Sequence, residues 1–296
     1  MFNKKLSLIL LLILIASNLY MSSFAENYRC TDNVNCVNHC PQKPYPIANP
    51  FSRGIQKIST INFLASKFAE GQVEKQISKY AKGDFDVNID SYSATDLYDG
   101  KLKGMSVNAT NVEFMDIYFS TINAKSDCDF ISIDYRATPV KLRAPLSVDF
   151  NGRVTEDDLN KIINGQKYKS QLAYIRRNND TFKFVDFINS RAIIKNNRIQ
   201  IMTDVKMPIL PQVMTLTVDS DFKIINNKIS LSNTKILTGN MNLDINFPQS
   251  FIDMLNPFIL NSAGLDSHGR KITLQKVNVN NNQIEIAGNL WLSKSK

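Results

Sequence analysis

Few residues in this chain have side chains suited to chemistry. It has two histidines, and its cysteines are Cys30, Cys36, Cys40 and Cys128. His39 lies beside Cys40, so a metal site is one interpretation of this cluster. Structural zinc sites use paired Cys-x-x-Cys knuckles, which the gaps of six and then four residues between the first three cysteines do not form. We therefore expect no metal site.

Disulfide bonds are the favoured interpretation of the cysteines. Exported proteins meet an oxidising environment, in which an even number of cysteines usually indicates disulfides. Four cysteines can pair in three ways, and each way ties the Asn- and Pro-rich segment 26–50 to the rest of the chain. All four cysteines are therefore disulfide candidates, and the sequence leaves their pairing open.

Catalytic constellations are scarce. His268 follows Asp266 and Ser267 in one turn, which could be a fragment of a hydrolase triad. Neighbours within a turn seldom form a triad, and no Gly-x-Ser-x-Gly nucleophile turn is present. The sequence also has no phosphate-binding glycine loop and no His-Glu-x-x-His zinc helix. It therefore predicts a protein that is not an enzyme and needs no cofactor.

Residues 1–25 have the three parts of a secretory signal peptide. Lys4 and Lys5 precede an apolar run over residues 6–16, and the segment closes on a small-x-small pattern at Ala25. The run of 11 residues is shorter than the roughly 18 to 20 that span a bilayer as a helix, so cleavage is favoured over retention as an anchor. We predict an exported periplasmic or cell-envelope protein that begins at Glu26.

The mature chain is basic and long enough for one large domain. Removing 25 of 296 residues leaves 271, and the formal net charge falls from +8 to +6 because the signal carries two lysines. This excess favours anionic partners, namely membrane surfaces or nucleic acid, and export makes nucleic acid an improbable partner. We place a Cys/Pro-rich lead-in at 26–50 and a single domain at 51–296.

A long helix is predicted after the lead-in. Apolar residues recur at helical spacing from Ile55 to Tyr80, and polar residues occupy the opposite side of the helical wheel. The pattern predicts an amphipathic helix over 55–81, about 40 Å long, that ends before Gly83. Gly71 weakens its second half, so a break is expected near that residue.

From Phe85 the apolar period changes to two, which indicates strands almost to the C-terminus. Three hairpins are recognisable because Asn-Asn pairs stand where the chain must turn, at 196–197, 226–227 and 281–282. Asparagine tolerates the positive φ of tight hairpin turns. Two-residue turns place the apolar residues of each hairpin on one face, so we expect sheets with one wet and one apolar face.

Other segments interrupt or vary this pattern. Residues 114–119 are apolar at both parities and predict a strand covered on both faces. Thr155 and the three acidic residues after it predict an N-cap and a helix that continues to Ile163. Helical spacing also predicts a helix over 248–260. Two prolines prevent continuous strand pairing over 205–214, an apolar stretch that is either a covered loop or a membrane-contacting lip.

The order of these parts carries more information than any one of them. The signal and long helix are followed by a strand, the turn Asp96-Leu97-Tyr98-Asp99-Gly100-Lys101, a sheet, the Val154-Thr155-Glu156-Asp157-Asp158-Leu159-Asn160 helix start and the strand Ile284-Glu285-Ile286-Ala287-Gly288-Asn289-Leu290. In this order the chain resembles the LmeA-like family of bacterial envelope proteins over roughly Ile55 to Leu292. It departs from the family pattern in the cysteine-rich lead-in and in the longer strand region 182–246.

The resemblance implies an α+β fold of the tubular lipid-binding type. In that fold a curved antiparallel sheet wraps around a long amphipathic helix, here with two shorter helices, and encloses an apolar groove. The resemblance also implies phospholipid binding and envelope maintenance, and the family has no catalytic motif to transfer. The expected partner is then phospholipid, which a peripheral protein would bind at a membrane surface, and the sequence leaves open whether the lipid is also transferred. Rim lysines and arginines would favour anionic head groups.

Two sets of residues are candidates for this function. The expected groove lining comprises Ile58, Ile61, Ala65, Phe68, Ile194, Ile199, Ile224, Ile229, Val279 and Ile284. If the stretch 205–214 is a membrane-contacting lip rather than the favoured covered loop, Met207, Ile209 and Leu210 form that lip. A ligand-free envelope scaffold is the alternative function, because an apolar face that holds an acyl chain and one that packs against another face use the same residues.

Overall fold

The structure is a computed structural model. It describes residues 46–48, 50, 61–78, 81–114, 116–134, 137, 141–178, 183–206, 212–238, 252–253, 255–258, 270–280 and 282–294.

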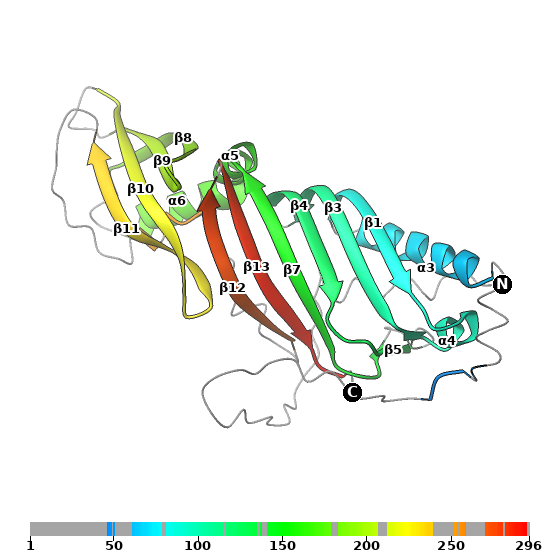
Figure 1. Ribbon diagram of the computed structural model, residues 1–296. Coiled ribbons are helices and arrows are strands. Elements are labelled where there is room, and N and C mark those ends of the chain that lie inside the picture. The colour runs from blue at the N-terminus through cyan, green and yellow to red at the C-terminus, as the bar shows by residue number, and fades with distance from the viewer. Residues whose placement is uncertain are drawn as a thin grey trace.

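Antiparallel sheets make up most of the described structure (Figure 1). The strands of the largest sheet, in spatial order, are β1 (Lys82–Asp90), β3 (Gly104–Phe114), β4 (Ile117–Ser126), β7 (Leu146–Thr155), β13 (Gln283–Leu292) and β12 (Arg270–Asn280). A four-stranded sheet contains β11 (Lys228–Thr238), β10 (Met214–Ile225), β9 (Arg198–Lys206) and β8 (Asp186–Lys195). A small third sheet contains β2 (Lys101–Leu102), β5 (Ile131–Asp134) and β6 (Lys141–Leu142).

The three predicted hairpins are present in the predicted register. Ile194 pairs with Ile199, Ile224 with Ile229, and Val279 with Ile284. The turn asparagines have φ values between 50° and 61° wherever the structure describes them, which is the left-handed region that asparagine tolerates. The Asn-Asn pairs therefore fixed the register of these strands, and with it the face on which each side chain lies.

The helices whose bounds fall within the described residues are α3 (Ile61–Ile77), α4 (Ala94–Tyr98), α5 (Glu156–Asn164) and α6 (Gln166–Asn178). α3 ends at Ile77, four residues before the end of the helix predicted over 55–81, and the predicted residues 55–60 lie outside the described part of the chain. The predicted break near Gly71 is wrong, because α3 continues through this residue. α5 begins as predicted, with Thr155 and Asp158 forming a reciprocal capping box.

Two local predictions need correction. Residues 114–119 are not one strand, because β3 ends at Phe114, β4 begins at Ile117 and these two residues pair across a turn. Asp116 adopts φ 64° in that turn, so the apolar residues belong to two neighbouring strands. The predicted helix over 248–260 reduces to a helical turn at 252–253 among its described residues. α6 was not predicted from the sequence, because its apolar residues are separated by many polar ones.

Two helices cover strand edges with their polar side chains. On α3, Glu74 accepts a hydrogen bond from the backbone N–H of Val87 (3.3 Å), and Glu70 accepts one from that of Ile89 (3.1 Å). Four residues of helix rise about 6 Å and two residues of strand rise about 6.6 Å, so the two spacings match. The carboxylates therefore satisfy donors that the edge strand β1 would otherwise leave unpaired.

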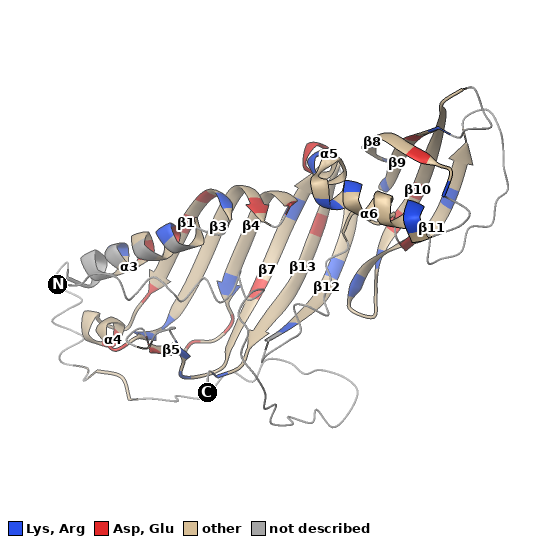
Figure 2. Ribbon diagram, turned by 180° about the vertical axis from the view of Figure 1, so that it is seen from behind, with Lys and Arg blue, Asp and Glu red and all other residues tan. Residues whose placement is uncertain are grey.

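α5 covers the edge of β8 in the same way. Glu156 accepts a hydrogen bond from the N–H of Ile194 (2.8 Å). The amide of Asn160 exchanges two hydrogen bonds of 2.9 Å with the backbone of Ala192, one as donor and one as acceptor. Seen from behind, α3, α5 and α6 lie on the same side of the sheets (Figure 2). The fold is thus α+β with mainly antiparallel sheets.

No helix within the described residues is both long enough and apolar enough to cross a bilayer.

Candidate functional site

One face of the six-stranded sheet is apolar and the other is polar. The register places Val107, Ala124, Phe150, Gly288 and Leu274 in one row across five strands, all on the apolar face. This separation follows from the strict alternation of side chains along each strand. The face that carries the helices in Figure 2 is the apolar one.

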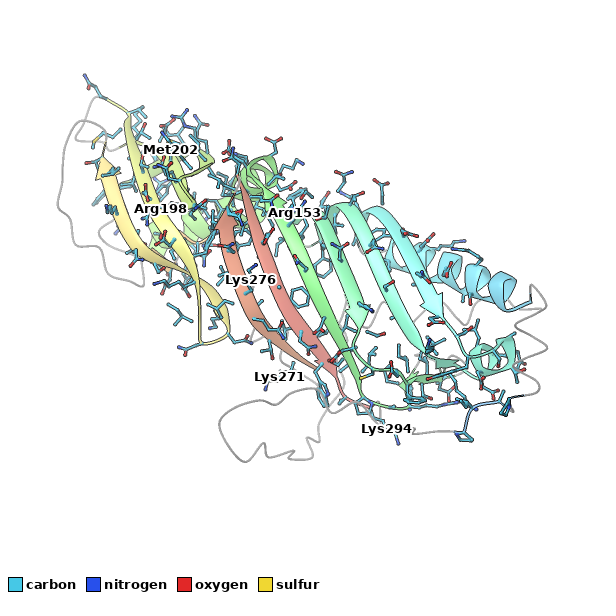
Figure 3. All side chains as sticks on the ribbon, in the orientation of Figure 1. Arg153, Arg198, Met202, Lys271, Lys276 and Lys294 are labelled. Atoms are coloured by element: carbon cyan, nitrogen blue, oxygen red, sulfur yellow. The ribbon has the colours of Figure 1, made fainter. Side chains whose placement is uncertain are left out.

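The polar face presents amides, hydroxyls and charges. Its neighbouring row contains Asn108, Asn123 and Asn151, and Figure 3 labels Arg153 and Lys276 on its later strands. An open hollow of about 250 Å³ lies at the β1 side of the sheet. Its lining is Asp84, Phe85, Asp86, Asn108, Ala109, Thr110, Thr121 and Asn123. The carboxylates and amides of this lining do not suit an acyl chain.

Two core clusters occupy opposite ends of the apolar face. The α3 cluster includes Val73 and Ile77 of α3 together with Val87 and Val107 of the sheet. The α5 cluster joins α5, α6 and the inner face of the four-stranded sheet to the ends of β7 and β13. Phe119 of β4 packs against both clusters. The apolar face is therefore covered at its two ends by different parts of the fold.

Partly exposed apolar side chains lie between or beside these clusters. We call this set the central apolar surface, and it comprises Phe85, Phe119, Ile122, Ala124, Phe150, Ile272, Leu274 and Val277. Each is half-buried and packs against one or both clusters. None of these side chains can ionise, so the surface offers contact to apolar groups and has no group for acid–base or nucleophilic catalysis.

Two glycines in strand interiors shape this surface. A Cβ atom at Gly288 would lie 2.8 Å from Cζ of Phe150, and one at Gly152 would lie 3.0 Å from Cδ1 of Phe119. The aromatic rings therefore lie directly over the glycine backbone, a packing known from other sheets in which an aromatic residue covers a glycine. Ala124, which also has a small side chain, pairs with Phe150 in the register. Because of these small residues, few side chains protrude from this part of the apolar face.

The predicted groove residues fall in more than one place. Ile194, Ile199, Ile229, Val279 and Ile284 are all buried in the α5 cluster, Ile199 and Ile284 completely. Neighbouring side chains therefore already cover these residues, which leaves little of their apolar surface for a ligand.

Of the other five predicted groove residues, the structure describes the side chain of one. Ile224 is half-buried. Ile58 and the side chains of Ile61, Ala65 and Phe68 lie outside the described part, and the described buried side chains of the same helix belong to the α3 cluster. Among the described side chains, those of the helix and those of the hairpins therefore belong to different clusters.

Sequence reasoning missed the central apolar surface, although one signal was available. Gly152 and Gly288 interrupt otherwise regular strands, and a glycine inside a strand often marks a close approach. The pairing of β7 with β13 joins residues 128 to 146 positions apart, so no local pattern could place these glycines on neighbouring strands.

The predicted membrane lip at Met207, Ile209 and Leu210 lies outside the described residues. Cys128 is buried and disulfide-bonded, whereas the other three cysteines, Cys30, Cys36 and Cys40, also lie outside the described residues. Within the described part of the chain, no group of histidine, cysteine, aspartate and glutamate residues could hold a metal ion.

The chain matches a known protein family over most of its length. The sequence model of the family described as LmeA-like phospholipid-binding matches residues 61–289. The chain belongs to this family. The resemblance expected from the order of sequence elements is therefore confirmed, and phospholipid binding is the function that the LmeA-like family suggests for this chain. No curated protein and no solved structure matches the chain.

Proposed function

We propose that this LmeA-like protein is an exported protein of the bacterial envelope that holds phospholipid acyl chains against the central apolar surface. The observation that carries the proposal is the central apolar surface, whose half-buried apolar side chains lie between or beside the two packed clusters on a sheet whose other face is polar. Apolar surface that neither cluster covers is a natural place for an apolar ligand.

The energy of such contact is sufficient for binding without a polar anchor. Each methylene buried against apolar side chains contributes about 0.8 kcal/mol, so roughly ten methylenes would contribute about 8 kcal/mol before the cost of ordering the chain. Head groups would remain at the rim of the sheet, where the basic excess of the mature chain favours anionic lipids. Added salt should weaken that preference and leave the acyl contribution unchanged.

Export is proposed from the N-terminal signal. Mass spectrometry of protein from the extracytoplasmic fraction should find an N-terminus at Glu26. Soluble extracytoplasmic protein that still contains Met1 would contradict the proposed cleavage.

The experiment that tests lipid binding uses protein purified without denaturants or detergent. Organic extraction and lipid mass spectrometry should find close to one phospholipid or more for each chain, and emptied protein should take up labelled phospholipid from vesicles. A chain that carries no stoichiometric lipid and takes none up would instead be a ligand-free scaffold. Transfer requires a separate result, namely movement of labelled lipid from donor to acceptor vesicles at a rate that rises with protein concentration.

A further inference from the structure

Large apolar side chains are exposed at one end of the four-stranded sheet. Phe184 is 65% exposed, Ile188 47%, Val213 54% and Leu237 45%. Phe184 lies just before β8, Val213 just before β10, and Leu237 near the end of β11. Because neighbouring strands run antiparallel, the beginnings of β8 and β10 and the ends of β9 and β11 meet at the same end of the sheet (Figure 1). We call this the distal end.

The register places several of these residues on one face. Thr217 pairs with Leu237 on one side and with Met202 on the other, so the three side chains share a face. Alternation along the strand puts Val213 on that face as well. Ile188 lies in a two-residue irregularity of β8, between the pairs that Phe187 and Ser190 make with β9. This face is turned away from the α5 cluster, into which the opposite side chains of β9 and β10 are packed.

The distal end is also basic. Arg177, Lys183 and Lys206 are exposed, and within the described residues none of them is paired with a carboxylate. The nearby carboxylates are engaged: Asp186 lies 2.5 Å from Arg176, and Asp204 accepts a hydrogen bond of 2.8 Å from Thr215. Separate apolar side chains among unpaired lysines and arginines match the interface of a bilayer, where acyl chains lie beneath anionic head groups.

We propose that the distal end docks onto the surface of a phospholipid bilayer that contains anionic lipids. The separate, protruding apolar side chains insert among the head groups, and the lysines and arginines contact lipid phosphates. A protein partner would be expected instead to meet a continuous apolar patch with few unpaired charges at its centre. The inference rests on the proposed function, because it assigns the end at which a lipid-binding chain meets its membrane.

The test measures co-sedimentation with vesicles of phosphatidylcholine containing about a quarter phosphatidylglycerol. The test variant is Val213→Asp. Its matched control is Ile225→Asp, because Ile225 is 48% exposed and lies at the other end of β10. Val213→Asp should lower vesicle binding roughly tenfold, because a charge replaces an inserting apolar group, and Ile225→Asp should bind like the wild type.

A second pair of variants tests the charges separately. Lys183→Glu with Lys206→Glu should weaken binding at least roughly tenfold at low salt, and less at high salt. Lys223→Glu with Lys228→Glu changes two exposed lysines at the opposite end of the same sheet and should have little effect. All variants are first compared with the wild type by thermal unfolding.

The outcomes separate this inference from the proposed function. Selective loss of vesicle binding in the distal variants, with their extracted lipid content unchanged, supports the docking surface. Wild-type protein that contains lipid but does not sediment with vesicles would overturn the docking surface and leave lipid binding intact. Equal losses in the distal variants and their controls would also overturn it. Wild-type protein that sediments with vesicles, but neither contains extractable lipid nor takes up labelled lipid, would instead contradict the proposed function.

Discussion

At the scale of single residues, Asn227 joins the two large sheets. It occupies the second turn position between β10 and β11 at φ 59°. Its side-chain amide donates to the carbonyl of Ile272 and accepts a hydrogen bond of 2.7 Å from the N–H of Leu274, both on the edge strand β12. One amide thus supplies the donor and acceptor that a neighbouring strand would supply. A turn residue that was expected only to reverse the chain also closes a sheet edge.

The first prediction concerns this residue. Asn227→Gly keeps the positive φ but removes both hydrogen bonds, so it should lower the free energy of unfolding by about 1 to 3 kcal/mol. Asn197→Gly is the matched control, since Asn197 occupies the same turn position of the β8–β9 hairpin at φ 58°. Urea unfolding of both variants measures the difference. Equal stability of the two would show that Asn227 acts only through its backbone conformation.

A second prediction at this scale concerns Asp219. Burial acts to raise its pKa, but hydrogen bonds from Gln200 and Arg198 and the charge of Arg198 together hold the pKa below its ordinary value of 3.8. A carboxyl whose pKa is lower in the folded state adds stability above its unfolded pKa and loses it as the pH falls through the folded one. The wild type should therefore lose part of its stability below about pH 4.

Asp219→Asn provides the test of that linkage. The variant should lose about 1 to 2 kcal/mol at neutral pH, because Arg198 loses a charged partner, and the loss should shrink as the pH falls below about 4. Thermal unfolding across this pH range measures it. A difference between variant and wild type that does not change with pH would contradict the lowered pKa.

At the scale of elements, α3 shows how the side chains of a helix can accept hydrogen bonds from the edge strand of a sheet. Its polar residues Glu70 and Glu74 bond to β1, whereas its apolar residues Ala69, Val73 and Ile77 enter the α3 cluster. Gly71 has an exposed position between them, and no atom lies within 4 Å of a Cβ placed there.

Gly71→Ala should therefore stabilise the protein. Alanine restricts the unfolded chain and favours the helix, so the free energy of unfolding should rise by about 0.5 to 1 kcal/mol. Thermal or urea unfolding measures the gain. A destabilised variant would show that the position is not open, and it would contradict the continuous α3 helix.

The elements that the sequence predicted well are those encoded locally. Asn-Asn turns gave the hairpin register, and Thr155 with Asp158 gave the start of α5, because a turn or a cap depends on a few neighbouring residues. The strand predicted over 114–119 failed because Asp116 in the left-handed region turned one apolar run into two strands. Apolar composition alone could not distinguish a covered strand from a hairpin.

At the scale of the whole molecule, the site depends on contacts that no local pattern encodes. β7 pairs with β13, which lies far along the chain, and only this pairing brings Phe150 beside Gly288. The sequence predicted one apolar face for each hairpin, which the structure confirms. It could not predict that the apolar hairpin residues would be buried in the α5 cluster. Nor could it predict that residues of β4, β7 and β12 would remain half-buried between the clusters.

The most direct test of the account asks which face of the six-stranded sheet holds lipid. Ala124→Trp places a large ring on the central apolar surface, and Ala287→Trp places the same ring on the polar face of the same sheet. The ring at position 124 should displace at least about two methylenes of the bound chain, worth about 1.6 kcal/mol, and so lower lipid affinity roughly tenfold.

The measurement is the amount of phospholipid extracted per protein chain, made on variants that both retain a cooperative thermal transition. We predict markedly reduced lipid in Ala124→Trp and wild-type lipid in Ala287→Trp. Wild-type lipid content and uptake affinity in Ala124→Trp, or a loss confined to Ala287→Trp, would contradict the claim that acyl chains lie on the central apolar surface.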